Sequence, residues 1–229
     1  EITSRKSYDV PTLAYMRNMG RVTTAKSYMM IGYDEVYDIE YMYHRYKGYW
    51  ARDGKTTIFD AFDKLHRGYS SIMERCRALD KMIYDDALAS GNERYAEILS
   101  ASYRQVMAAH KLFEDKDGNL LYFSKENASN GCVNTVDLTY PSAPIYLIYN
   151  VELEKAMMTS IFDYSRSGRW TKPFAAHDLG TYPIANGQVY AADMPLEEAG
   201  NMITLMAQIA MIEGNTRYAE RYWDLLQLW

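Results

Sequence analysis

Apolar and aromatic residues recur at steps of three and four over most of this chain, which predicts amphipathic helices. The predicted helices cover about residues 34–50, 57–89, 93–112, 151–165, 195–212 and 216–229. Their ends carry local signals: Thr56 or Thr57 and Asn92 are possible N-caps, Pro195 stands at a helix start, and Gly214 stands at a helix end. Long helices joined by short turns predict a mainly α fold built as an array of hairpins.

Two stretches rich in Gly, Pro and Asn interrupt this pattern, at about residues 124–149 and 168–194. The first follows a predicted tight turn at 115–119 and a short strand at 120–123, and it predicts a long structured loop or hairpin. Loops of this length within a compact domain usually carry function. We therefore expect the functional site to lie on these two stretches.

Composition limits the classes of protein that this chain can represent. Its 229 residues leave room for one large domain or two small ones, and with no interior linker we predict a single domain over 1–229. The net charge of −5 argues against nucleic acid as a partner, and no apolar run is long enough to span a membrane. The N-terminus lacks the apolar core of a signal peptide. Cys76 and Cys132 are too few for a disulfide framework, and whether they pair stays open.

The C-terminal pattern predicts a fragment of a longer protein. The last predicted helix runs to the end of the chain without a stop signal. Trp223, Leu226 and Trp229 would face a partner that this chain does not contain. Further domains of the same full-length chain are therefore expected partners.

The first interrupting stretch carries candidate polar groups. Lys125 and Glu126 form a pair in which the carboxylate would stay ionised, and Asn127 and Asn130 could bind a polar substrate through their amides. Asp137 follows between β-branched residues, where it could be half-buried. The alternative is a purely structural role, because Asn, Ser and Asp side chains often form hydrogen bonds with the backbone of their own loop or cap a turn.

The second stretch is denser in groups that build pockets. Arg169 offers a cation for a carboxylate, Trp170 and Tyr182 offer aromatic walls, and Asp178 offers a carboxylate for proton transfer. His177 precedes Asp178 directly, so their adjacency is not an indication of a catalytic triad. The alternative for His177 is a structural histidine.

A third candidate lies at the start of the helix predicted from Pro195. Glu197 and Glu198 fall in its first turn, where the helix dipole favours negative charge, so simple capping is the alternative to a catalytic role. Cys132 with His177 could form a thiol nucleophile and its base, although nothing in the sequence brings them together. No phosphate-binding or HExxH motif occurs, and we predict neither cofactor nor bound metal.

These segments, taken together, resemble the glutaminase A family in its six-hairpin helical domain. The matching runs are Gly32–Asp34, Tyr103–Gln105, Ala109–Lys111, Phe123–Asn127, Asn130–Cys132, Thr135–Asp137, Tyr140–Pro144, Gly168–Trp170, His177–Pro183 and Met194–Met202. One departure is Ala176, which stands where the family pattern leads us to expect proline.

The resemblance implies an (α/α) toroid of helical hairpins, related in fold to many glycosidases and present here as a fragment. It also implies an N-terminal β-rich domain and further hairpins outside this chain, and export of the protein. The implied activity is hydrolysis of the side-chain amide of L-glutamine to L-glutamate and ammonia. The family supplies no catalytic set that we carry over to these residues, and the same fold hosts several chemistries.

Amide hydrolysis needs a base for water, donors for the oxyanion and an acid for the leaving ammonia. We assign the acid–base pair to Asp178 with Glu197 or Glu198, and keep Glu126 and Asp137 as further catalytic candidates. Arg169 or Lys125 would bind the α-carboxylate of a small-molecule substrate, and Asn127 or Asn130 would donate to the oxyanion.

Two other functions stay open. A glycoside hydrolase or carbohydrate-binding relative on the same toroid would use the same carboxylates, with Trp170 and Tyr182 stacking on a sugar. A non-catalytic helical scaffold would use the loops to bind a partner. Each reading requires that the three polar segments meet in space.

Overall fold

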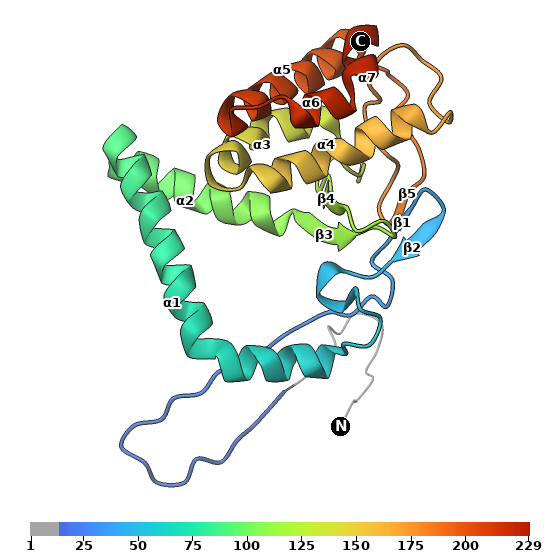
Figure 1. The fold of residues 1–229 in the computed structure, drawn as a ribbon. Helices are drawn as coiled ribbons and strands as arrows, with labels where there is room; N and C mark the ends of the chain where they lie inside the picture. Colours follow the sequence, from blue (N-terminus) through green and yellow to red (C-terminus); the bar gives the residue numbers. More distant parts are fainter. Residues whose placement is uncertain (1–13) are drawn as a thin grey trace. The chain divides into compact units, whose positions relative to one another are not determined.

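The computed structural model describes residues 14–229, which fall into two units divided between Gly32 and Tyr33. Residues 14–32, in the first unit, form neither helix nor strand. The second unit, from Tyr33 to Trp229, contains all the elements described below (Figure 1). A mainly α fold is confirmed, and no helix in the described part of the chain is long and apolar enough to cross a membrane.

The helix predicted at 34–50 is wrong, because this segment forms a β-hairpin. Strands β1 (Ile39–Tyr41) and β2 (His44–Tyr46) pair antiparallel, and a short 3-10 helix (Tyr49–Ala51) follows. The two residues of the hairpin turn, Met42 and Tyr43, both have positive φ, which matches the turn that favours the twist of a hairpin. The spacing of apolar residues alone does not distinguish two short paired strands from a short helix.

Helices α1 (Ile58–Ser90) and α2 (Glu93–Ala108) form the helical hairpin that the sequence predicts. Thr57 and Asp60 form a reciprocal capping box at the start of α1, and Asn92 accepts a hydrogen bond from the Tyr95 backbone at the start of α2. These caps satisfy backbone groups that the first helical turn leaves unpaired. Both helix starts are therefore fixed by residues that the sequence identifies.

The predicted extension of the third helix to residue 112 is wrong, since strand β3 (His110–Glu114) begins just after α2. It pairs with β4 (Leu120–Ser124), the predicted strand, across the predicted tight turn. Asp115 holds this turn by accepting backbone hydrogen bonds from Asp117 and Asn119. Strand β4 then packs against α4 (Val151–Arg166), a helix that the sequence predicts (Figure 1).

The loop predicted at 124–149 is wrong from residue 136 onward, where helix α3 (Val136–Tyr149) forms despite two internal prolines. Each interior proline removes a helix hydrogen bond at a cost on the order of 3 kcal/mol. A buried face at helical spacing offsets this cost, and its residues are Val136, Thr139, Ala143 and Tyr146. Tertiary packing therefore overrides the local breaking signal.

Helix α5 (Pro195–Glu213) begins and ends as predicted, with Gly214 in the left-handed conformation after it. It packs against α3 and α4, and the main core lies between these helices, β1, β4 and the loop that follows α4 (Figure 1). That loop is the second predicted one, and it contributes only the two-residue strand β5 (Ile184–Ala185), which pairs parallel with β1.

The single helix predicted from 216 is divided into α6 (Arg217–Arg221) and α7 (Trp223–Leu228). Tyr222 lies between them, fully buried and stacked on Phe162 with the ring centres 4.2 Å apart. Trp229 also stacks on Phe162, at 5.2 Å. The expectation that Leu226 and Trp229 face an absent partner is therefore wrong, because both pack against the main core, whereas Trp223 remains 57% exposed.

Candidate active site

Backbone hydrogen bonds join the two predicted loops. The Val133 amide donates to the Gly180 carbonyl at 2.8 Å, and the Val136 amide donates to the His177 carbonyl at 2.9 Å. Because Val136 is the first residue of α3, these bonds fix the start of that helix beside His177. The start of α3 and the second loop, which are far apart in sequence, are thus held together by their main chains.

Three polar side chains meet at this point, one from each of the three segments that the sequence singles out. Asp137 comes from the first turn of α3, His177 from the loop, and Glu198 from the first turn of α5. The His177 Nε2 atom lies 3.9 Å from Asp137 Oδ1 and 4.0 Å from Glu198 Oε1. One ligand atom from each residue lies within 4.8 Å of the others, so this Asp137–His177–Glu198 cluster could also hold a metal ion.

Asp178 orients the histidine of the cluster. Its Oδ2 atom lies 3.0 Å from His177 Nδ1, and it also accepts the Tyr190 amide at 3.1 Å, while Oδ1 accepts the amides of Gly180 and Val189. The neighbouring residues His177 and Asp178 therefore do interact. With both oxygens engaged, Asp178 serves as a positioning group that leaves Nε2 of His177 facing the cluster.

Burial of the carboxylates in the cluster lowers the stability of the fold. Glu198 is fully buried, and neither of its oxygens has a hydrogen-bond partner; the Oδ1 atom of Asp137 is also buried and unpartnered. A buried charged group without a partner costs several kcal/mol, or more, in stability. Asp137 nevertheless has 30% of its side chain exposed, which opens the cluster to solvent on that side.

The surroundings of the cluster also perturb the pKa values of Glu198 and His177. Burial, together with the charge of Asp137, raises the pKa of Glu198 to about 8; His177 and the Asn201 side chain, which lies outside normal hydrogen-bond geometry, oppose the rise. Burial lowers the pKa of His177, but the hydrogen bond to Asp178 and the charges of Asp137 and Glu198 outweigh it, so the net pKa is raised. Such perturbed pKa values concentrate at functional sites.

Other predicted substrate-binding residues gather at a separate small cavity of about 120 Å³, lined in part by Lys125, Asn127 and Tyr182. The Lys125 ammonium lies 4.6 Å from the centre of the Tyr182 ring. The Tyr182 hydroxyl donates to Glu35 at 2.6 Å and accepts from Lys111 at 2.7 Å. The residue-by-residue search of the sequence missed Glu35 and Lys111, because no local motif connects positions so far apart in the chain.

The remaining candidates lie elsewhere. Trp170 is in the core, with its indole N–H donating to the Phe174 carbonyl, and Arg169 is exposed over the Tyr43 ring. Asn130 accepts the amide of Cys132 two residues on, as a turn residue does. Glu197 is exposed and Glu126 half-buried, and neither belongs to the cluster.

The two cysteines are free, so no disulfide joins them. Cys132 is buried, and this burial, with the charges of Asp178 and Glu126, raises the pKa of its thiol to about 11. A thiol with that pKa stays protonated at neutral pH, and the Nδ1 atom of His177 is already engaged by Asp178. The geometry therefore gives a thiolate mechanism no support.

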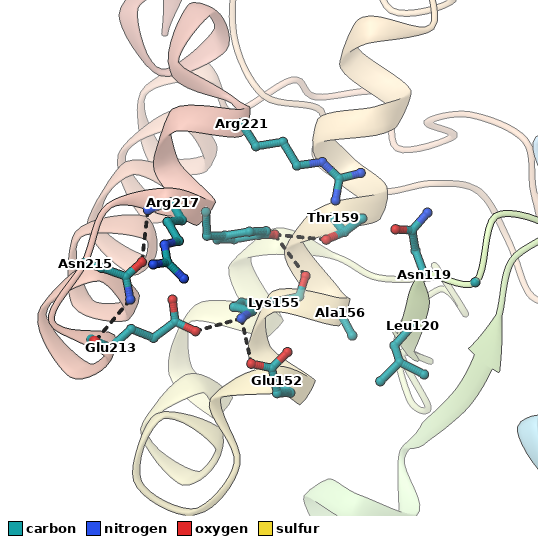
Figure 2. Close-up of a pocket in the computed structure, with 12 residues that line it drawn as sticks. Asn119, Leu120, Glu152, Lys155, Ala156, Thr159, Glu213, Asn215, Arg217 and Arg221 are labelled. Atoms are coloured by element: carbon teal, nitrogen blue, oxygen red, sulfur yellow. Dashed lines mark hydrogen bonds and ion pairs between the residues drawn. The ribbon is translucent and has the colours of Figure 1, made fainter.

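A larger open cavity of about 540 Å³ lies between α4, α6 and the β3–β4 turn (Figure 2). Lys155 bridges Glu152 and Glu213 at 2.6 and 2.7 Å, and Arg217 and Arg221 line the same cavity. None of the residues predicted as functional lines it. We therefore place the candidate active site at the Asp137–His177–Glu198 cluster, where the chemistry-bearing groups converge.

The fold and the cluster together define a domain of helical hairpins with a buried polar centre at the N-terminal ends of α3 and α5. Residues 92–229 match the family model of the glutaminase A six helical-hairpin domain, and since this is more than half of the chain, the protein belongs to that family. Residues 3–86 match a second family, a domain of unknown function (DUF5127). A single partial six-hairpin domain over 1–229 stays a prediction.

Two curated relatives have names that include the word glutaminase. The chain is 32% identical over 232 aligned residues to glutaminase A of Aspergillus oryzae, covering 96% of this chain and 33% of that protein. It is 34% identical over 123 residues to a probable glutaminase of Arthroderma benhamiae, covering 52% of this chain and 14% of that protein. The chain thus spans a third or less of the length of these relatives. No solved structure matches it.

Proposed function

We propose that the full-length protein hydrolyses the side-chain amide of L-glutamine, releasing L-glutamate and ammonia, and that the Asp137–His177–Glu198 cluster is the reaction centre. The observation that carries this proposal is the meeting of three polar segments at one buried, partly open point. The names of the two relatives suggest the reaction, since one is glutaminase A and the other is a probable glutaminase.

The geometry favours a different set of catalytic groups from the pair expected on sequence. Asp178 has both oxygens engaged and Glu197 points away from the cluster, whereas Asp137 and Glu198 face the free nitrogen of His177. Asp137 is the member that solvent reaches. It would hold the attacking water against the substrate amide, with His177 and Glu198 completing the polar surround that stabilises charge during hydrolysis.

Recognition of the amino acid would require a cation for its α-carboxylate. Lys125 is our candidate, because it shares a cavity with Asn127 and Tyr182 on the same two segments that supply the cluster. Arg169 is the weaker candidate, since its guanidinium lies over Tyr43 on the exposed surface.

Ammonia release from L-glutamine by the full-length gene product tests this proposal. Asp137→Asn should lower kcat by about 100-fold or more, because it removes the accessible carboxylate of the cluster. Glu97→Gln, a matched change at an exposed position of α2, should alter the rate by less than about two-fold. No ammonia release by the wild type, or equal rates in wild type and Asp137→Asn, would overturn the assignment.

A glycoside hydrolase is the second candidate, and one distance favours it. One carboxylate oxygen of Asp137 and one of Glu198 lie no more than 4.8 Å apart, which is compatible with the separation of about 5 Å found in retaining glycosidases. The burial of Trp170 in the core removes the aromatic platform that we expected to stack on a sugar. Sugar release from a panel of oligosaccharides, in the absence of glutaminase activity, would favour this candidate. Export of the protein stays a prediction that cell fractionation would test.

A further inference from the structure

We propose that Asp137, His177 and Glu198 bind a divalent transition-metal cation, with Zn²⁺ as the best fit to the ligand set. Binding of the cation follows from the cluster alone, whereas its part in amide hydrolysis rests on the proposed function. No sequence motif marks this site, because its three members lie in separate segments rather than at a short spacing.

The first argument is the chemistry of the atoms that face one another. With Nδ1 of His177 bonded to Asp178, its Nε2 atom faces carboxylate oxygens of Asp137 and Glu198. All three are acceptors when the imidazole is neutral and the carboxylates are ionised. Among residues 14–229, neither carboxylate has a Lys or Arg ion pair. A cation would satisfy all three atoms at once.

The second argument is independent of the cluster's composition. Glu198 is fully buried, points at His177, and has no hydrogen-bond partner for either oxygen. Buried side-chain oxygens are almost always hydrogen-bonded, and buried charges are paired or coordinate metals. Asp178, which is equally buried beside the same histidine, accepts three backbone amides, whereas the oxygens of Glu198 point at polar groups that cannot all donate to them.

The third argument is the support behind the histidine. Histidine ligands of metals commonly donate their other ring N–H to a carboxylate, which fixes the tautomer and the ring orientation. Asp178 fills this position at 3.0 Å from His177 Nδ1 and is itself held by three backbone amides. Tyr190 stacks on the imidazole with the ring centres 4.2 Å apart, which restricts its rotation further.

The distances fit a small cation after a modest closure. Zinc bonds to nitrogen and oxygen ligands are about 2.0–2.2 Å long, so tetrahedral ligand atoms lie about 3.3 Å apart. The observed separations of 3.9 and 4.0 Å would need to shorten by about 0.6–0.7 Å to reach that geometry. The separation between the Asp137 and Glu198 oxygens, which is at most 4.8 Å, would need to shorten by at most about 1.5 Å. Calcium and magnesium fit less well, because both prefer oxygen-only ligand sets.

Three protein ligands leave a fourth position free, on the side where Asp137 meets solvent. That is the arrangement of catalytic zinc sites, in which the open position takes water or the substrate carbonyl. A cation here would polarise the amide carbonyl and lower the pKa of the bound water, so that water attacks carbon and ammonia leaves with a proton. No oxidant or further reactant is needed.

The test is metal binding by the full-length gene product, measured directly. Elemental analysis of the purified protein, followed by chelation and calorimetric titration with Zn²⁺ or Mn²⁺, should show about one cation per chain. Asp137→Asn and Glu198→Gln should each weaken binding at least about 10-fold, whereas Glu97→Gln should not change it. The Asp137 carboxylate accepts no hydrogen bond within residues 14–229, so Asp137→Asn should leave the fold native by circular dichroism.

Each outcome decides the proposal. Failure of the wild type to bind either cation, or equal affinity in Asp137→Asn and the wild type, would overturn the metal site. Glutamine hydrolysis that survives complete chelation would overturn its catalytic part while leaving the proposed function intact. Tight binding that the two ligand variants abolish, without any glutamine hydrolysis, would uphold the site and reject the glutaminase assignment.

Discussion

Glu154 offers a quantitative test of how burial acts in this fold. It lies on α4, is fully buried, and has no hydrogen-bond partner for either oxygen. Burial alone raises the pKa of its carboxyl group from the ordinary value of 4.5 to about 8. The folded protein therefore keeps a proton that the unfolded chain releases between these two pH values, and stability falls as pH rises through that window.

The size of the effect follows from the shift. The difference between about 8 and 4.5 corresponds to roughly 5 kcal/mol at 1.36 kcal/mol per pH unit, of which roughly 3–4 kcal/mol falls between pH 5 and pH 8. Glu154→Gln cannot ionise, so it removes this loss. We expect the variant to gain stability relative to the wild type steadily from pH 5 to pH 8.

Urea unfolding of the full-length gene product, followed by tryptophan fluorescence at several pH values, measures the difference. The informative quantity is the change in relative free energy of unfolding between pH 5 and pH 8, since the fixed cost of burying an amide cancels. Glu97→Gln, at an exposed position, is the control and should show no such change. Parallel pH profiles for Glu154→Gln and the wild type would refute the claim that burial sets the protonation of Glu154.

Two further substitutions test the loop that carries the histidine. Asp178→Asn should destabilise the protein by about 3–5 kcal/mol in urea unfolding, because its amide nitrogen would face the Tyr190 N–H donor; a loss under about 1 kcal/mol would contradict the hydrogen-bond pattern. Gly180→Ala should lower the free energy of unfolding by about 2–4 kcal/mol, because φ is 138° and an added Cβ would lie 2.2 Å from the Ile184 carbonyl oxygen. Gly118→Ala is the control: φ is also positive, but nothing lies within 4 Å of the added Cβ, so the loss should be about 1 kcal/mol. Equal losses for the two glycine variants would show that the close contact does not matter.

The elements that could be predicted are those whose ends carry their own signals. Helix ends of this kind can be recognised from the sequence because the residue at the end acts on backbone groups next to it in the chain. The examples here are Thr57, Asn92, Pro195 and Gly214. Helix α3 could not be found in this way, because its prolines argue against it locally and only its buried face argues for it. The break at Tyr222 depends likewise on a stacking partner, Phe162, that lies far away in the sequence.

The candidate site shows the same division. That the polar segments meet was predicted, since loops and helix starts gather at one end of a hairpin array. The residues that meet could not be ranked from the sequence. Glu197 and Glu198 are neighbours of identical chemistry, and only the rotation of α5 decides that Glu198 faces inward while Glu197 faces solvent.

Hydrogen bonding, rather than burial, distinguishes the carboxylate of Asp178 from the carboxylate of Glu198, which we propose to be functional. Asp178 and Glu198 are equally buried, yet Asp178 accepts three backbone amides and contacts His177, whereas Glu198 accepts none. Glu154 shows that a missing partner is not sufficient by itself, because in the described part of the chain it joins no group of metal-binding side chains. Glu198 combines a missing partner with two facing polar groups, Asp137 and His177. An unsatisfied buried carboxylate lowers stability. The position of Glu198 opposite a fixed imidazole is therefore what we expect where a bound ligand or substrate supplies the missing interaction.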